Sequence, residues 1–263
     1  MSNRLRTLTY NIHKCRGLDG RVQPTRIVEV LREIDADVIA LQEVLSIQGS
    51  PEEHQAQFIA GELGFHACFG ENRRHNGGGY GNLLLSRFRL LAIDNHDITT
   101  PGRERRGCLR ADIELETTLH VFNLHLGTSF FERRQQARKL ISPQILHNPE
   151  LHGVRVVLGD FNEWTRGLAS RLLSRNFQRD SVGGSRTFPT LLPLLRLDQM
   201  YFDPALEMER LAVHRSRTSL VASDHLPLVA DFNLSTSAAT AKYQHSRPAN
   251  ASADTGAILI GTT

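Results

Sequence analysis

One stretch of the chain joins an apolar run to two polar side chains that could do chemistry. Residues 154–158 read Val-Arg-Val-Val-Leu, and Gly159, Asp160, Phe161 and Asn162 follow them. A β-branched, apolar run of this kind is typical of a buried strand. Because side chains alternate along a strand, we expect Asp160 and Asn162 on the same side where the strand ends. A carboxylate and an amide on a rigid strand end can be held in the fixed geometry that phosphoryl chemistry needs.

Polar residues also end other apolar segments of the chain. They lie in the short sequences Thr-Tyr-Asn-Ile, Leu-Gln-Glu, Asn-Leu-His-Leu, Arg-Leu-Asp and Ser-Asp-His-Leu-Pro-Leu. Alone, each has a plain structural interpretation, such as a turn residue, a surface ion pair or a buried histidine. Together they form a series of candidate site residues, in chain order Asn11, Glu43, His125, Asp160, Asn162, Asp198, Asp224 and His225.

Strands and helices must bring these scattered residues together. Besides the run at 154–158, apolar patterning predicts strands over residues 5–12, 37–44, 65–69, 83–94, 108–116, 119–126, 198–202 and 223–234. Helices are predicted from Pro24, after the capping box Ser50–Glu53 as far as Gly64, from Ser129 towards Pro143, and near residues 168–173. The glycine cluster at 77–81 lacks the lysine and spacing of a phosphate-binding loop, so we interpret it as flexible loop. This order of elements predicts buried mixed sheets covered by helices.

The composition is that of a soluble globular protein, with 40% hydrophobic and 22% charged residues among 263. A formal net charge of +3 is compatible with an anionic substrate without demanding one. No run of about 18 apolar residues predicts a transmembrane segment, and the first residues lack the apolar core of a signal peptide. Cys15, Cys68 and Cys108 are widely spaced, so we expect free thiols and a cytoplasmic location.

The chain divides into two parts by composition. No linker interrupts residues 1–234, which we expect to form one domain. Sixteen of the last 29 residues are Ser, Thr or Ala, and few are large and apolar. Residues 235–263 are therefore predicted to be a disordered tail.

Taken in order, the motifs resemble those of the endonuclease/exonuclease/phosphatase superfamily. This group includes pancreatic-type DNases, abasic-site endonucleases, sphingomyelinases and inositol polyphosphate phosphatases. The resemblance spans roughly residues 5–233 and lies in six motifs in one order, rather than in any one of them. It implies an α/β fold, a four-layer α/β/β/α sandwich of two mixed β-sheets flanked by helices. It also implies a divalent-metal-dependent hydrolase of phosphate esters.

The resemblance further implies a role for each candidate residue. Glu43 would be the principal ligand of Mg²⁺, or of Mn²⁺, with Asn11 as a helper, and these are oxygen donors of the kind that Mg²⁺ prefers. Asp224 would either coordinate the metal or steady the site. The number of metal ions stays open.

The remaining candidates would act on water and on the phosphate. By resemblance, Asp160 would orient and deprotonate the attacking water. Asn162, His125 and His225 would donate hydrogen bonds to the scissile phosphate. Asp198 would accept a hydrogen bond from His225, which fixes the tautomer of that ring and favours its charged form.

Four residues have no settled role. His13 stands where abasic-site nucleases have an acidic residue, which weakens the inference of a second acidic metal site. Tyr80 and Asn82 are equal candidates for a contact with phosphate. Arg110 could point at a phosphate or be an ordinary surface arginine.

Three functions compete. We favour a nuclease that cleaves DNA, because the basic loops at Arg73-Arg74 and at 103–106 could contact backbone phosphates, although aromatic residues are only 6%. The second is a phosphodiesterase or phosphatase acting on a phospholipid headgroup or small phosphorylated molecule, although the sequence contains no amphipathic membrane helix. The third is a non-catalytic binding module, which would not need the ionisable set. No protein partner is indicated.

Overall fold

Two six-stranded β-sheets face each other at the centre of the structure, a computed structural model that describes residues 4–50, 52–179 and 185–234. The first sheet has the order β11-β12-β1-β2-β4-β3, and the second has the order β5-β6-β7-β8-β10-β9. The first comprises β1 (Arg4–Asn11), β2 (Val38–Ser46), β3 (His66–His75), β4 (Gly78–Ser86), β11 (Glu207–Val213) and β12 (Leu228–Asn233). The second comprises β5 (Leu90–Asp97), β6 (Gly107–Ile113), β7 (Leu119–His125), β8 (Val154–Asp160), β9 (Gln178–Arg179) and β10 (Asp198–Phe202).

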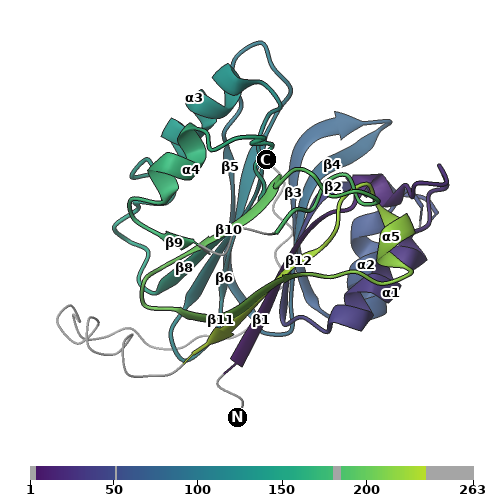
Figure 1. Cartoon of the computed structure of the whole chain (residues 1–263), viewed down its shortest axis with the longest axis horizontal. Helices are drawn as coiled ribbons and strands as arrows, with labels where there is room; N and C mark the ends of the chain where they lie inside the picture. Colours follow the sequence, from purple (N-terminus) through teal and green to yellow (C-terminus); the bar gives the residue numbers. More distant parts are fainter. Residues whose placement is uncertain (1–3, 51, 180–184, 235–263) are drawn as a thin grey trace.

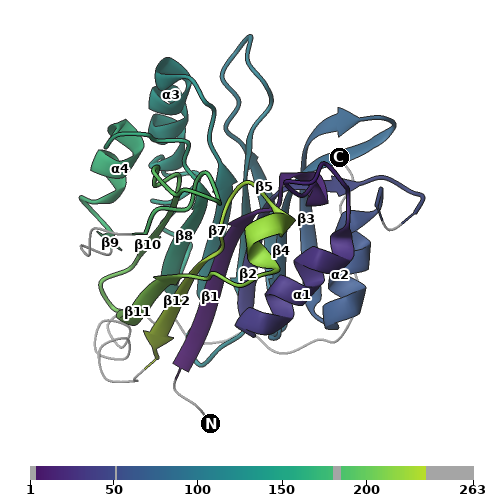
Figure 2. The same cartoon turned by 45° about the vertical axis from the view of Figure 1, so that its right-hand side comes forward.

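Helices cover the outer face of each sheet (Figures 1 and 2). On one side lie α1 (Pro24–Ile34), α2 (Gln55–Leu63) and the short α5 (Ser219–Ala222); on the other lie α3 (Phe130–Leu140) and α4 (Leu168–Leu173). The predicted four-layer sandwich of mixed sheets is therefore confirmed. No helix in the described part of the chain is long and apolar enough to cross a membrane.

Strand alternation divides the apolar side chains among three cores. In β1, Leu5 faces the second sheet and packs in a core between the sheets, whereas Leu8 and Tyr10 face α1 and α2. In β7, Val121 joins the core between the sheets, whereas Phe122 packs towards α3 and α4. The three cores thus bind the four layers together by burial of apolar surface.

Between the sheets, the inward-facing side chains change from apolar to polar along each strand. β7 presents Leu119 and Val121, then Asn123 and His125. β1, β2 and β8 change in the same way, ending with Asn11, Gln42 and Asp160. The pairs β1–β2 and β7–β8 are parallel, so the carboxyl ends of all four strands lie at one edge of the sandwich. Two sheets that each contain a parallel pair therefore bring the candidate residues to the same edge.

Several predicted elements match closely, and others are wrong. The strand predicted over 83–94 is two strands, because the chain turns after β4 and crosses to the other sheet as β5. The glycines at 77–81 are not a flexible loop, since β4 begins at Gly78. A Cβ on Gly81 would lie 1.9 Å from the carbonyl oxygen of Gly70, so glycine permits this close strand approach.

Corrections also apply to the boundaries of other elements. The helix predicted from the capping box begins only at Gln55, after a hydrogen-bonded turn from Ser50 to His54, and Pro51 lies outside the described residues. The strand predicted over 223–234 is only β12, and β11 was not predicted. The predicted tail, 235–263, lies outside the described residues, so the domain boundary stays a prediction.

Candidate active site

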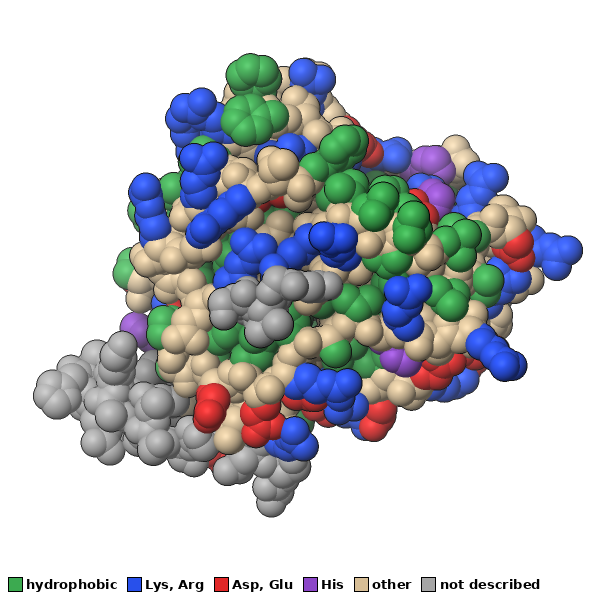
Figure 3. Space-filling view, in the orientation of Figure 1, with side chains coloured by type: hydrophobic (Ala, Val, Ile, Leu, Met, Phe, Trp, Pro, Cys, Tyr) green, Lys and Arg blue, Asp and Glu red, His purple; other side chains and the backbone are tan. Residues whose placement is uncertain are grey.

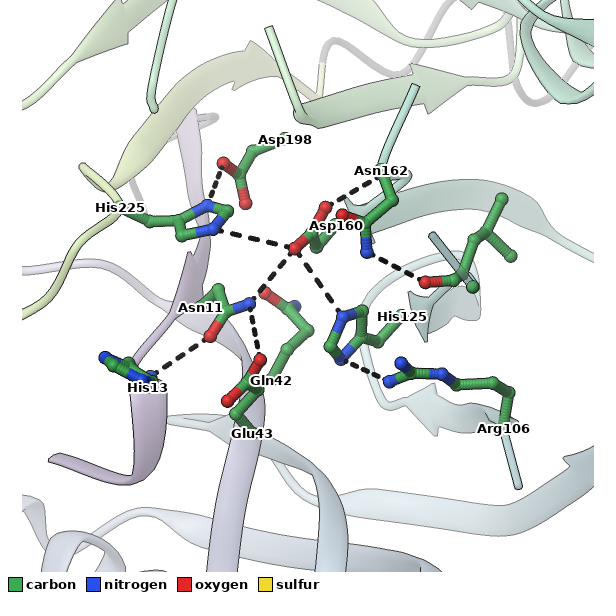
Figure 4. Close-up of polar contacts among 12 residues, drawn as sticks. Asn11, His13, Gln42, Glu43, Arg106, His125, Asp160, Asn162, Asp198 and His225 are labelled. Carbon is green, nitrogen blue, oxygen red and sulfur yellow. Dashed lines mark hydrogen bonds and ion pairs between the residues drawn. The ribbon is translucent and has the colours of Figure 1, made fainter. Parts of the chain in front are cut away.

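Asp160 lies at the centre of the polar edge between the sheets (Figure 4). Its Oδ2 atom accepts a hydrogen bond from Nδ2 of Asn11 at 3.0 Å. The same oxygen lies 3.6 Å from Nε2 of His125 and 3.7 Å from Nε2 of His225. Its other oxygen accepts the backbone N–H of Asn162 at 2.9 Å. The carboxylate is almost fully buried, so these groups hold its orientation.

Asn162 lies beside Asp160 for a different reason from the predicted strand alternation. β8 ends at Asp160, and Asn162 has a left-handed backbone with φ of 50°. One N–H of its side chain donates to the carbonyl oxygen of Leu126 at 2.9 Å. The expectation that alternation positions Asn162 is therefore wrong, because a tight turn positions it.

A bulge in β2 directs Glu43 to the site. Regular alternation would turn Glu43 away from Gln42, which faces the interior and donates to Asn123 at 2.8 Å. The register between β2 and β4 shifts between Leu41 and Val44, and Glu43 has φ of 57°. The carboxylate consequently lies near Asn11, whose Nδ2 is 3.4 Å from its Oε1. Bulges re-aim side chains in this way beside active sites.

Lys14 pairs with Glu43 from a strained turn. The short helix η1 (His13–Cys15) follows β1, and its three residues have φ of 47°, 57° and 56°. Non-glycine residues rarely adopt this region, so surrounding contacts must hold it. Gln55, which is fully buried, donates to the Lys14 carbonyl at 2.7 Å, and Nζ of Lys14 lies 2.8 Å from Oε2 of Glu43.

The pKa of Glu43 reflects these neighbours. Burial alone would raise it, but the positive charge that His125 gains on protonation and the hydrogen-bonded ammonium of Lys14 lower it to about 2. Glu43 is therefore ionised at neutral pH.

His225 and Asp198 form a buried ion pair. Nδ1 of His225 lies 2.8 Å from Oδ2 of Asp198, which is fully buried and also accepts the hydroxyl of Thr187. Burial alone would lower the pKa of His225, but the charge and hydrogen bond of Asp198, together with Asp160 and Asp224, raise it to about 10. His225 is therefore a cation at neutral pH, with Nε2 directed towards Asp160 (Figure 4).

The charge state of His125 differs from that of His225. Its Nδ1 lies 3.0 Å from Nη1 of Arg106, a buried residue immediately before β6. Burial and the positive charge of Arg106 lower the pKa of His125 to about 4, against the opposing effect of Asp160 and Glu43. At neutral pH this ring is uncharged.

The structure brings most of the predicted residues into one contact network. Polar contacts of 3.7 Å or less link Asn11, Glu43, His125, Asp160, Asn162, Asp198 and His225. Asp224 is half-buried at the margin of this group, where its Oδ1 lies 3.6 Å from Nδ1 of His13. The structure shows these contacts, and the chemical roles of the eight candidate residues remain predictions.

Tyr80, Asn82 and Arg110, which had no settled role, lie in different surroundings. Tyr80 lies near the site, with Nζ of Lys14 6.0 Å and the guanidinium of Arg73 4.3 Å from the ring centroid. Asn82 is fully buried between the sheets, where it donates to backbone carbonyls. Arg110 pairs with Asp112, at 3.2 Å.

Sequence reasoning missed several residues at this edge. Lys14 and Arg106 contact Glu43 and His125, and Gln42 and Gln55 support the strand end and the strained turn. Arg106 belonged to the basic loop at 103–106, and Lys14 follows His13 directly, but no periodicity marks either residue. Only the contacts identify them.

Oxygen donors at this edge fit a hard divalent cation. Glu43 is ionised. The side-chain oxygen Oδ1 of Asn11 accepts the backbone N–H of His13 at 3.0 Å and has a second lone pair that could bind a cation. Within the described ranges, no group of three or more His, Cys, Asp or Glu side chains is arranged to hold a metal ion. Mg²⁺ does not require such a cage, because it commonly binds one or two carboxylates together with water and substrate phosphate.

A sandwich of two facing mixed sheets, with this polar edge between them, defines a known class of protein. The family model described as "Endonuclease/Exonuclease/phosphatase family" matches residues 8–225. The chain therefore belongs to the endonuclease/exonuclease/phosphatase family. It is also 31% identical over 246 residues to YbhP, an uncharacterized protein of Escherichia coli strain K12, covering 87% of this chain and 96% of YbhP.

Solved structures share the fold at low sequence identity. An endonuclease/exonuclease/phosphatase from Beutenbergia cavernae has a TM-score of 0.69 at 23% identity, covering 88% of this chain and 72% of that one. The mannosyl-6-phosphatase Bt3783 of Bacteroides thetaiotaomicron has a TM-score of 0.71 at 16% identity, covering 87% and 99%. TDP2 of D. rerio, complexed with a single-strand DNA product, has a TM-score of 0.67 at 15% identity, covering 88% and 99%.

Proposed function

We propose that this protein is a divalent-metal-dependent hydrolase of phosphate esters, in which an activated water attacks phosphorus. The observation that supports this most is the meeting of Asp160 with one neutral and one cationic histidine, beside the ionised Glu43. A carboxylate can take the proton of water, and the N–H groups can bind the phosphoryl oxygens.

In this proposal each side chain acts through the contacts described above. Asp160 orients the water and accepts its proton as the oxygen of the water bonds to phosphorus. The bond from phosphorus to the ester oxygen breaks in the same step, and that oxygen leaves as an alcohol after it takes a proton from solvent. The imidazolium of His225 binds a non-bridging oxygen, and Asp198 keeps that ring charged. Asn162 holds Asp160 through its backbone N–H and offers its remaining side-chain N–H to the phosphate.

Glu43 and Asn11 would hold Mg²⁺ or Mn²⁺, and Asp224 would help from the margin. When bound, the cation neutralises charge on the phosphate oxygens. Lys14 would release Glu43 for this contact, because one ammonium and one cation compete for the same carboxylate.

We propose DNA as the first substrate, as the sequence favours. Exposed arginines lie on segments that leave the site edge, namely Arg16 after η1, Arg103 and Arg105 before β6, Arg134 in α3 and Arg166 after Asn162. Such cations bind backbone phosphates without regard to sequence. TDP2, a structural relative, was solved with a single-strand DNA product.

One observation favours the second candidate, a phospholipid headgroup or another phosphoester with an apolar part. Large apolar side chains on segments near the same edge are exposed, including Phe131 at 72%, Trp164 at 71% and Leu191 at 70%. Figure 3 shows hydrophobic and Lys or Arg side chains side by side over the upper half of the face in view. Exposed apolar patches with a polar rim often mark binding surfaces.

A substrate panel tests the proposal and separates the two candidates. The purified chain is incubated with plasmid DNA, abasic duplex, single strands, RNA, phosphoinositide and sphingomyelin, with Mg²⁺ or with Mn²⁺. We expect hydrolysis of at least one phosphate ester, abolished by excess EDTA and restored by added metal. Cleavage of DNA alone supports the nuclease, and hydrolysis of lipid headgroups alone supports the second candidate. Full activity in EDTA, or hydrolysis of none, contradicts the proposal.

A further inference from the structure

Arg106 is buried next to His125 and is fixed there by its own contacts. Only 6% of Arg106 is exposed, and its Nη2 donates to Oε2 of Glu104 at 2.9 Å. Its backbone N–H donates to the hydroxyl of Thr99 at 3.0 Å, and its carbonyl accepts the N–H of Ile98 at 3.0 Å. These bonds tie both ends of the residue, so Nη1 has a defined position 3.0 Å from Nδ1 of His125.

The chemistry of the two groups determines where the proton of His125 must be. A guanidinium stays protonated in proteins, and every nitrogen of it is a donor. A hydrogen bond from Arg106 therefore requires a lone pair on Nδ1 of His125. A neutral imidazole with its lone pair on Nδ1 has its hydrogen on Nε2. That atom faces Asp160, at 3.6 Å from Oδ2 (Figure 4).

We propose that Arg106 is a positioning residue that holds His125 in the tautomer protonated on Nε2, so that His125 presents an N–H beside Asp160. The purpose of this N–H rests on the proposed function, since a donor at this place would bind an oxygen of the scissile phosphate. The tautomer itself is a property of the free protein, and it can be measured without any substrate.

The groups around His125 agree with a neutral ring. Arg106 and His225 oppose a positive charge on His125, whereas Asp160 and Glu43 favour one. Burial also disfavours the charged ring, and the pKa of His125 falls to about 4. At neutral pH the ring therefore has one hydrogen to place, and the neighbour of Nδ1 places it.

The two histidines differ because of what faces Nδ1. At His225 the neighbour is the carboxylate of Asp198, an acceptor, which draws a hydrogen to Nδ1 and stabilises the cation. At His125 the neighbour is a guanidinium, a donor, which excludes that hydrogen. Asp160 therefore lies between a cationic donor and a neutral donor, each directed by a residue behind it.

Nitrogen-15 NMR of the free protein tests the tautomer directly. Long-range proton–nitrogen spectra of histidine-labelled protein distinguish a protonated Nε2 from a protonated Nδ1, and the spectrum of His125→Asn identifies the signal of His125. We expect a protonated Nε2 in the wild type and in Arg106→Lys, which keeps a donor. Arg106→Met should give a mixture of tautomers. Arg105→Met, an exposed arginine in the same loop, is the matched control and should leave the signal unchanged.

Kinetics then separate positioning from direct contact with substrate. On the substrate that the panel identifies, we expect Arg106→Met to lower kcat about 10- to 100-fold with KM within about twofold, and Arg106→Lys to recover part of the loss. Nε of Arg106 has no hydrogen-bond partner among the residues described, so a direct role on phosphate is the competing explanation. A fall in kcat with an unchanged tautomer would establish that role and overturn the proposal.

Different results would overturn the tautomer assignment and the proposed function. A wild-type spectrum with the hydrogen on Nδ1 overturns it even if Arg106→Met does not fold, because that measurement needs no variant of Arg106. A protein with the expected tautomer and no activity on any substrate contradicts the proposed function but leaves the tautomer assignment intact.

Discussion

At the scale of single residues, the side chains around Asp160 differ in protonation state because their own neighbours differ. His225 is charged because Asp198 accepts its Nδ1 hydrogen, and His125 is neutral because of burial and Arg106. Burial would raise the pKa of Glu43, but the charge that His125 gains on protonation and the ammonium of Lys14 lower it to about 2. In water both histidines would titrate at about pH 6.5, so the difference between them comes from their surroundings.

Removal of the base should stop hydrolysis while the fold remains. We expect Asp160→Asn to lower kcat about 10²- to 10⁴-fold, because an amide cannot accept the proton of water. His225→Ala should lower kcat about 10²- to 10³-fold, because a hydrogen-bond donor to the phosphate is lost. Circular dichroism and thermal melting check the fold, and Glu150→Gln, an exposed residue, is the control. Near-wild-type turnover in either variant would contradict the assigned roles.

The raised pKa of His225 should make stability depend on pH. A histidine whose pKa is about 10 in the folded protein and about 6.5 when unfolded stabilises the fold fully below pH 6.5 and loses this contribution as pH rises through 10. We expect Asp198→Asn to lower the pKa of His225 and to flatten this decline. NMR titration of His225 and unfolding between pH 6 and 10.5 measure both effects. Titration of the wild-type ring near pH 6.5 would show that the ion pair does not form.

At the scale of elements, the site is built where regular strand geometry ends. β2 reaches Glu43 through a bulge, β8 gives way to a left-handed Asn162, and β1 continues into the strained η1. Strain of this kind costs about 1–3 kcal/mol per residue and persists only where surrounding contacts hold it. The buried Gln55 is one such contact, because it ties the turn to α2.

Gly159 shows how closely the parallel pair β7–β8 must approach. It has φ of 147°, and a Cβ placed on it would lie 1.9 Å from the carbonyl oxygen of Leu124. We expect Gly159→Ala to destabilise the protein by more than about 3 kcal/mol, since backbone cannot give way like a flexible side chain. Urea unfolding measures the change. Gly61→Ala is the control, because apart from its chain neighbours and the backbone of its own helix no described atom lies within 4 Å of a Cβ on that residue. Equal stability of both variants would contradict the argument.

At the scale of the whole molecule, the two sheets contribute matching halves of one site. The parallel pair β1–β2 supplies Asn11 and Glu43, and the parallel pair β7–β8 supplies His125 and Asp160. Neither sheet alone contains the set, so the site depends on the packing of the core between the sheets. The three cores, one between the two sheets and one between each sheet and its helices, are all formed by residues between 4 and 234.

Deletion of residues 235–263 should therefore leave the domain intact. The composition of this segment favours disorder, and the described residues between 4 and 234 form three cores of their own. We expect the melting temperature and activity of the 1–234 chain to equal those of the full chain. A large loss of stability would show that the segment docks on the domain.

The sequence by itself determined much of this protein. The apolar, β-branched run at residues 154–158 and the periodicity after Pro24 predicted β8 and α1, and the order of polar strand ends indicated the family and eight candidate site residues. These features could be predicted because the period of side chains along a strand or helix is a local property. The break between β4 and β5 could not, because an apolar run does not reveal where the chain changes sheets.

Only the tertiary structure decided how the site is organised. Lys14, Arg106 and Gln55 acquire their partners through contacts between residues 19 to 41 positions apart, to which local sequence patterns are blind. The charge of His125 and of His225 depends on burial and on the group facing Nδ1, neither of which is encoded in the residue type. Short-range pattern fixes which elements form, whereas long-range packing fixes what each polar side chain meets.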